Sequence, residues 1–267
     1  MKANRSRLSR VSRFSPVARA FTLVELLVVF AILTVLISFM LPAAAGTLRA
    51  ARTFRCQSSQ RSIAFDFKVF ADERLHGSRG EDAPLGDSLF RLETFQESQY
   101  LVDEFWAWPG QSIVRVPDTR GNDPMRCPEV RGELTLRSNS PCSQGAVDPP
   151  QRISFGFNMR LHRPEVVQPD GTINFSTPAR LSSSIVDLPG IPLFWDVDGE
   201  LAATLGVSPT FSAPSLDSAG PLSGDQYWFP ALRHAGKSNF AFTDGSVKTS
   251  ATPLTESGWR WDYQSGR

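Results

Sequence analysis

The stretch ARAFTLVELLVVFAILTVLISFMLPAAAG, residues 18–46, is the one strongly apolar segment of the 267-residue chain. At ~1.5 Å of rise per residue, its most apolar part, residues 21–41, would form a helix about 30 Å long, which matches the thickness of a bilayer core. Buried helices of soluble domains are rarely apolar on every face over such a length. The segment therefore predicts a transmembrane helix over residues 21–43.

A basic leader, residues 1–20, precedes the apolar segment and contains no Asp or Glu. Its basic residues are Lys2, Arg5, Arg7, Arg10, Arg13 and Arg19. Basic residues beside a membrane span stay on the cytoplasmic side. We therefore expect a single-pass protein of the cytoplasmic (inner) membrane, with its N-terminus in the cytoplasm and its C-terminal body on the exported side.

Glu25 is the one acid inside the apolar segment. A carboxylate within the membrane is costly and usually has a partner. A cleaved secretory signal is an alternative interpretation, because LPAAAG resembles a cleavage site and would give a mature chain that begins near Gly46. However, the apolar region of a signal peptide is shorter, ~7–15 residues, and an acid is out of place in it.

The sequence A-F-T-L-V-E followed by a full apolar span resembles the class III leader of type IV pilins and type II secretion pseudopilins. The resemblance implies that a prepilin peptidase cuts between Ala20 and Phe21 and methylates the new amine of Phe21. It also implies that Glu25 pairs with the N-terminal amine of a neighbouring subunit, and two paired charges in lipid cost less than either alone. Ala20 departs from the usual Gly, so we expect a slower cut.

The segment after the membrane span continues as an amphipathic stem helix over residues 44–76. Ile63, Phe67 and Phe70 recur at spacings of four and three, which places them on one helix face. The 20 prolines and 19 glycines of the chain lie mainly after residue 77, which predicts short strands and long connections in an exported body over residues 77–267. The net charge of +1 argues against nucleic-acid binding.

Alternating and apolar runs in the body predict short strands at residues 112–116, 153–158, 191–195, 239–243 and 246–249. The last two flank Asp244-Gly245, which is the strongest two-residue signal for a β-hairpin. The body therefore has the pattern of a small antiparallel sheet whose final hairpin is placed near the C-terminus.

Four stretches of the body resemble a planctomycete group of pseudopilin-like proteins, the H-X9-DG (DUF1559) group. They are MRCPEV, ISFGFNMRL, IPLFWDVDG and RHAGKSNFAFTDGSV. The last one carries the group's signature as His234, Asp244 and Gly245. The resemblance implies an α+β, pilin-like fold, in which a long N-terminal transmembrane helix continues into a stem packed on a small antiparallel β-sheet with long loops.

Two polar motifs in the body offer chemistry. His234 and Asp244 could orient a base or bind a metal, but the chain shows no nucleophile motif. We therefore expect structural roles, with His234 bonded to a loop and Asp244 in the hairpin turn. Asp196, Asp198 and Glu200 of WDVDGE resemble half of a calcium loop. Some secretion pseudopilins hold calcium in C-terminal loops, so calcium stands beside a solvated turn as an alternative, and no other cofactor is expected.

The chain has three cysteines, Cys56, Cys127 and Cys142. Disulfides form on the exported side of a membrane, and the sequence leaves their pairing open. A Cys127–Cys142 bond would close a short loop. A Cys56–Cys127 bond would tie the stem to the body, and the resemblance favours it because those two segments carry the group's usual cysteines. We expect no thiol nucleophile, since the sequence shows no positioned His.

These features predict a structural protein and no enzyme. The expected partners are the prepilin peptidase, other pilin or pseudopilin subunits and inner-membrane lipid, and the expected product is a pilus or a type II secretion-type filament. The alternative is an exported enzyme or ligand-binding domain that uses the leader as an anchor and the His234/Asp244 or Asp196/Asp198 region as its site.

Overall fold

The computed structural model describes residues 21–77, 79–100, 113–116, 123, 125–137, 147–174, 177–216 and 220–263. Ala20, the rest of the leader and Cys142 lie outside these residues. The chain divides into two compact units, Met1–Leu48 and Arg49–Arg267.

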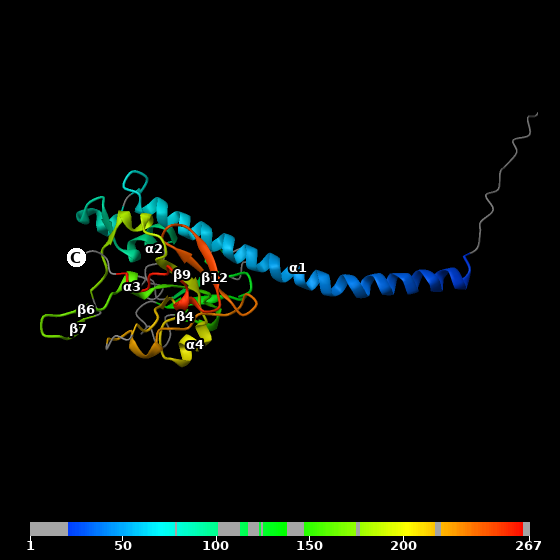
Figure 1. Ribbon diagram of the computed structural model, residues 1–267. Coiled ribbons are helices and arrows are strands. Elements are labelled where there is room, and N and C mark those ends of the chain that lie inside the picture. The colour runs from blue at the N-terminus through cyan, green and yellow to red at the C-terminus, as the bar shows by residue number, and fades with distance from the viewer. Residues whose placement is uncertain are drawn as a thin grey trace, which may run out of the picture. The chain divides into compact units, whose positions relative to one another are not determined.

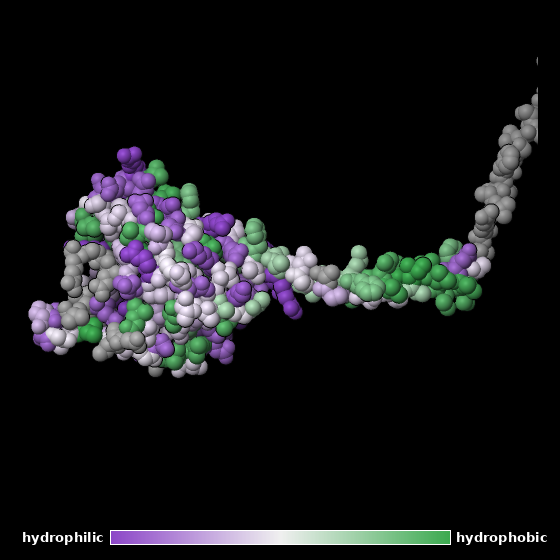
Figure 2. Space-filling model, viewed as in Figure 1, coloured by the Kyte–Doolittle hydropathy of each residue, from purple (hydrophilic) through white to green (hydrophobic). Residues whose placement is uncertain are grey.

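The first unit is the N-terminal part of helix α1, which spans Leu23–Ala71 and contains Pro42. Its apolar side chains are exposed on all sides, and they form the continuous green surface in Figure 2. Among the described residues, α1 is the one helix long and apolar enough to cross a membrane. The structure thus confirms the predicted long apolar helix.

The stem, residues 49–71 of α1, belongs to the second unit. It ends at Ala71 rather than at the predicted residue 76. The backbone N–H of Arg74 binds the carboxylate of Asp72 at 2.7 Å, and the N–H of His76 reaches the Asp72 carbonyl at 3.0 Å. An Asp side chain that binds nearby N–H groups competes with the helix, and here it replaces the last predicted turn.

The largest sheet of the second unit has five strands (Figure 1). Its order is β10 (Phe211–Ser212), β5 (Phe155–Asn158), β9 (Pro192–Asp196), β11 (Ser238–Phe242) and β12 (Val247–Ser250). All neighbours pair antiparallel except β10 and β5, which are parallel. Four of the predicted strands are therefore confirmed within one to two residues, and the parallel edge strand departs from the expected antiparallel sheet.

Smaller elements surround this sheet, and the fold class is α+β. β2 (Ile113–Val116) confirms the fifth predicted strand and pairs with β3 (Leu134–Arg137), which pairs with β4 (Val147–Asp148). The other strand pairs are β1 (Leu89–Phe90) with β8 (Leu181–Ser182), and β6 (Val166–Val167) with β7 (Ile173–Asn174). The short helices are α2 (Leu92–Tyr100), α3 (Met159–His162) and α4 (Gly199–Thr204).

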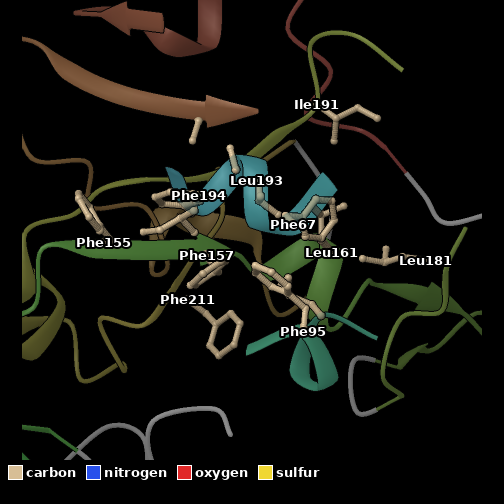
Figure 3. Close-up of a cluster of buried hydrophobic side chains, with 14 of the residues drawn as sticks. Phe67, Phe95, Phe155, Phe157, Leu161, Leu181, Ile191, Leu193, Phe194 and Phe211 are labelled. Carbon is tan, nitrogen blue, oxygen red and sulfur yellow. The ribbon is translucent and has the colours of Figure 1, made fainter. Parts of the chain in front are cut away.

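Both faces of the five-stranded sheet are buried because side chains alternate along each strand. Phe194 and Ala241 belong to the core that includes Phe67 of the stem. Figure 3 shows the rings of Phe67 and Phe194 together with those of Phe95 and Phe157. Trp195 and Phe240 belong to a second core, built with the C-terminal tryptophans. The stem is therefore an integral layer of the second unit.

Arg79 closes the C-terminal end of the stem and is buried. Its guanidinium donates to the carbonyls of Phe70 and Ala71, both at 3.2 Å, which are among the last acceptors of α1. It also donates to the carbonyls of Asp87 at 2.5 Å and Leu89 at 3.1 Å. Cationic side chains near a helix C-terminus are favourable, and this one satisfies carbonyls that have no other helix partner.

Arg79→Met is expected to lower the free energy of unfolding by about 2–3 kcal/mol, because it leaves several buried carbonyls without a donor. Arg74→Met is the matched control, since Arg74 is exposed on the adjacent turn, and it should change stability by less than about 0.5 kcal/mol. Chemical unfolding of the full chain in mild detergent measures both. Equal effects of the two variants would contradict the role assigned to Arg79.

Candidate functional site

The start of α1 is a capping box formed by Thr22 and Glu25. The backbone N–H of Thr22 donates to Glu25 Oε2 at 2.9 Å, and the Thr22 hydroxyl donates to the same oxygen at 2.8 Å. In return, the Glu25 N–H donates to Thr22 Oγ1 at 3.2 Å. This reciprocal pattern satisfies N–H groups that the first turn of a helix leaves without partners.

The capping box gives Glu25 a role inside its own chain, next to Phe21. The T-x-x-E pattern is visible in the sequence as T-L-V-E and is a known helix-start signal. An acid in an apolar run first suggests a charge in lipid, and the helix-start role of Glu25 becomes evident only when Thr22 is considered with it. Phe21 stands immediately before the cap and is exposed.

A second group of polar side chains lies inside the second unit. We call Cys56, Cys127, Asp196 and His234 the Cys–His–Asp cluster. All four are buried, and one donor atom of each lies within 4.8 Å of the others. Four separate segments supply them, namely the stem, the turn at residues 125–130, the last residue of β9, and the turn before β11.

The distances inside the cluster join its members into one group. His234 Nε2 lies 3.2 Å from Asp196 Oδ2 and 3.6 Å from Cys127 Sγ. Cys56 Sγ donates to Asp196 Oδ1 at 3.4 Å. The imidazole, the carboxylate and both thiols therefore face one point.

Further residues hold the cluster from outside. The Thr53 hydroxyl lies 3.2 Å from His234 Nδ1, so the ring nitrogen that faces away from the thiols has a partner. The backbone N–H of Asn239 donates to Asp196 Oδ2 at 2.9 Å, and Arg233 Nη1 lies 3.8 Å from Asp196 Oδ1. Thr53 and Cys56 are three residues apart on α1, which places both on the same helix face.

The cluster shifts the proton affinities of its members. Hydrogen bonding with Cys56 lowers the pKa of the Cys127 thiol to about 6, aided by the hydrogen bond with His234 and opposed by burial. Hydrogen bonding with Cys127 and burial raise the pKa of the Cys56 thiol. Burial lowers the pKa of His234, but hydrogen bonds to Asp196 and Cys127 outweigh it and raise that pKa to about 10.

His234 and Asp244 of the signature are not brought together. They stand at opposite ends of β11, whose five residues span about 17 Å at ~3.3 Å per residue. Asp244 accepts from the N–H and the hydroxyl of Ser246 at 2.9 and 2.6 Å, and Gly245 has a φ of +86°, which favours glycine. Asp244-Gly245 thus forms the hairpin turn between β11 and β12, as predicted.

Asp196 and Asp198 bind different partners. Asp196 belongs to the Cys–His–Asp cluster, whereas Asp198 is the N-cap of α4. Asp198 Oδ1 accepts from the N–H groups of Glu200 and Leu201 at 3.0 and 3.1 Å. The acidic pattern read as half of a calcium loop is therefore divided between a buried group and a helix start.

The structure brings Cys56 and Cys127 together, as the resemblance implied, but as thiols. No positioned histidine is visible from the spacing of the cysteines in the sequence, but the fold supplies one, since His234 Nε2 lies 3.6 Å from Cys127 Sγ. Both cysteines are 0% exposed and His234 is 4% exposed, so no substrate can reach the thiols in this conformation.

Comparison with known proteins identifies the N-terminal segment. A family model described as the prokaryotic N-terminal methylation motif matches residues 16–41. No curated protein and no solved structure matches the chain. The match and the apolar helix together indicate a membrane-anchored protein with a pilin-like, prepilin-type leader.

Proposed function

We propose that the chain is a pseudopilin-like structural subunit. It is matured by a prepilin peptidase and assembles through its N-terminal helix into a pilus or a type II secretion-type filament. The observation that carries this proposal is the methylation motif at residues 16–41, which overlaps a helix whose apolar side chains are exposed on all sides. Such a surface requires lipid or other apolar helices around it.

Charge at the start of α1 supports the same proposal. Removal of the leader between Ala20 and Phe21 creates an amine one residue before the cap. Glu25 is exposed in this chain, and a carboxylate and an amine from neighbouring helices would neutralise each other in lipid. The pair would also fix the register of adjacent subunits.

The second unit fits a pilin-like subunit in its architecture. The stem of α1 packs on a mainly antiparallel sheet through Phe67 and Phe70, so the helix that anchors the chain also builds the core of its body. We assign the body to the exported side, because the arginines of the leader favour the cytoplasm for the N-terminus. The proposed role is structural, and no residue is assigned to catalysis.

Mass spectrometry of the mature chain tests the proposed maturation. Expressed with a prepilin peptidase, the full chain should begin at Phe21 and carry one methyl group on its amine. Without the peptidase, the leader should remain attached. Chemical cross-linking of the same membranes should then give a ladder of oligomers only for the matured chain.

Ala20→Gly is the matched variant for this experiment. It restores the usual small residue and should speed processing without changing the site of the cut. A mature chain that begins near Gly46 in either form would overturn the proposal, because a signal peptidase would then have removed the whole apolar segment.

A further inference from the structure

The geometry points to a zinc site. We propose that the Cys–His–Asp cluster binds one zinc ion through Cys56, Cys127, Asp196 and His234, and that this ion ties the stem of α1 to the sheet. The inference concerns the second unit alone and does not depend on filament assembly.

The spacing of the donor atoms fits a tetrahedral ion. Zinc bonds of about 2.3 Å to sulfur and about 2.0–2.2 Å to nitrogen or oxygen place neighbouring donors about 3.4–3.6 Å apart at tetrahedral angles. Three of the six donor separations in the cluster are 3.6 Å from Cys127 Sγ to His234 Nε2, 3.4 Å from Cys56 Sγ to Asp196 Oδ1 and 3.2 Å from His234 Nε2 to Asp196 Oδ2. The four ligand atoms all lie within 4.8 Å of one another, so side-chain movements that bring one Asp196 oxygen to the centre would close four bonds around one ion.

The donor set selects zinc. Two soft thiolates, a borderline imidazole and one hard carboxylate are all ligand types that tetrahedral zinc accepts, whereas calcium and magnesium require oxygen donors throughout. All four residues are buried. A closed site with four protein ligands is typical of structural zinc, since catalytic zinc keeps a position open for water.

The surroundings of the cluster are those of a metal site. Histidine ligands usually bind a second group through their other ring nitrogen, which fixes the ring orientation. Here the Thr53 hydroxyl lies 3.2 Å from His234 Nδ1. The Asn239 N–H in turn holds Asp196 Oδ2 at 2.9 Å.

The charge of the cluster is partly compensated. Two thiolates, one carboxylate and a neutral imidazole around a divalent ion carry a net charge of −1, and the Glu129 carboxylate, 4.0 Å from His234 Nδ1, adds a second negative charge beside them. Arg233 lies 3.8 Å from Asp196 Oδ1 and supplies one positive charge. Buried charges are tolerated when they are paired or coordinate a metal.

A disulfide between Cys56 and Cys127 is the competing state of the same residues. It would need a sulfur–sulfur distance of about 2.05 Å, and it would use only two of the four convergent side chains. Zinc accounts for all four, because it requires the imidazole and the carboxylate as well as the thiols. It would join the stem, β9 and both turns at one point.

Metal analysis of the full chain tests the zinc site. The chain, purified in mild detergent without chelator and supplied with zinc, should retain about one zinc per chain after exhaustive dialysis. Cys127→Ser should lower this content by about tenfold or more, since metal sites rarely survive loss of a thiolate ligand. Cys142→Ser is the matched control, because it removes the third cysteine and leaves all four proposed ligands in place, and it should keep the full content.

Cobalt substitution of the unaltered chain provides a readout that does not depend on how a variant folds. Cobalt should produce the strong visible bands of a four-coordinate ion together with thiolate-to-cobalt charge transfer, and Asp196→Asn should alter the visible bands. The proposal is overturned if the chain retains no zinc or cobalt, if mass spectrometry finds a Cys56–Cys127 disulfide that persists in the metal-supplied protein, or if Cys127→Ser retains as much zinc as Cys142→Ser.

Discussion

Replacing Glu25 with glutamine is expected to abolish assembly while leaving the leader cut and the chain in the membrane. Glutamine serves in a capping box as glutamate does, so the bonds between residue 25 and Thr22 can persist. What the variant removes is the charge that would pair with the amine of a neighbouring Phe21. Loss of one partner from a buried charge pair costs about 2 kcal/mol or more, which corresponds to contacts about 30-fold weaker.

Thr22→Ala is the matched control for the Glu25 variant. It removes the hydroxyl from the capping box and should cost about 1 kcal/mol of local helix stability, but it keeps the carboxylate. Cross-linking of matured chains in membranes should therefore show oligomers for Thr22→Ala and monomers for Glu25→Gln. If Glu25→Gln assembles like the unaltered chain, the carboxylate serves only the helix start, and the proposed intersubunit pair is wrong.

Replacing Phe67 with alanine is expected to lower the free energy of unfolding of the second unit by about 3–5 kcal/mol. Phe67 is 0% exposed. Its ring packs edge-on against Phe95 and Phe90, with centroids 5.2 and 5.6 Å apart, on the side of the sheet that the stem covers (Figure 3). Removal of the ring leaves a cavity between the stem and the sheet that rigid neighbours cannot fill.

Phe65→Ala separates packing from helix propensity. Phe65 is two residues away on the same helix but is 62% exposed, so its loss should change stability by less than about 0.5 kcal/mol. Thermal unfolding of the full chain in detergent should place the Phe67 variant about 10 °C below the unaltered chain and the Phe65 variant close to it. Similar shifts for both would mean that the stem does not form the core described here.

The apolar segment and the strands were predictable because their signals are local. A run of apolar residues at 21–41 requires a helix in lipid, and Asp244-Gly245 requires a tight turn whatever surrounds it. The parallel strand β10 was not predictable. It has two residues, Phe211 and Ser212, and such a short strand exists only because β5 offers it a paired edge.

The Cys–His–Asp cluster could not be derived from sequence spacing. Successive members of the cluster lie between 38 and 71 residues apart along the chain. No local motif links them. The signature around His234 pointed to one member, yet it suggested Asp244 as the partner instead of Asp196. Ligands gathered from separate turns converge only after the sheet has formed, so the pattern appears in space and not in the sequence.

The acidic residues at the end of β9 and just after it show that a local sequence pattern can also fit two different structures. Asp198 and Asp196 alternate as calcium ligands do, but an Asp before a helix is equally typical of an N-cap. Composition alone does not separate these outcomes. The hydrogen bonds from Glu200 and Leu201 to Asp198 show which one the chain adopts.

The capping box at the start of α1 affects the state of a subunit in the membrane before it assembles. For the proposed subunit, the Thr22 hydroxyl and N–H keep the Glu25 carboxylate bonded within its own helix. An idle chain therefore need not hold a bare acid at the edge of the lipid. Recruitment then becomes an exchange of partners, from a local hydroxyl to a neighbour's amine, and a reserve of unassembled chains can persist in the membrane.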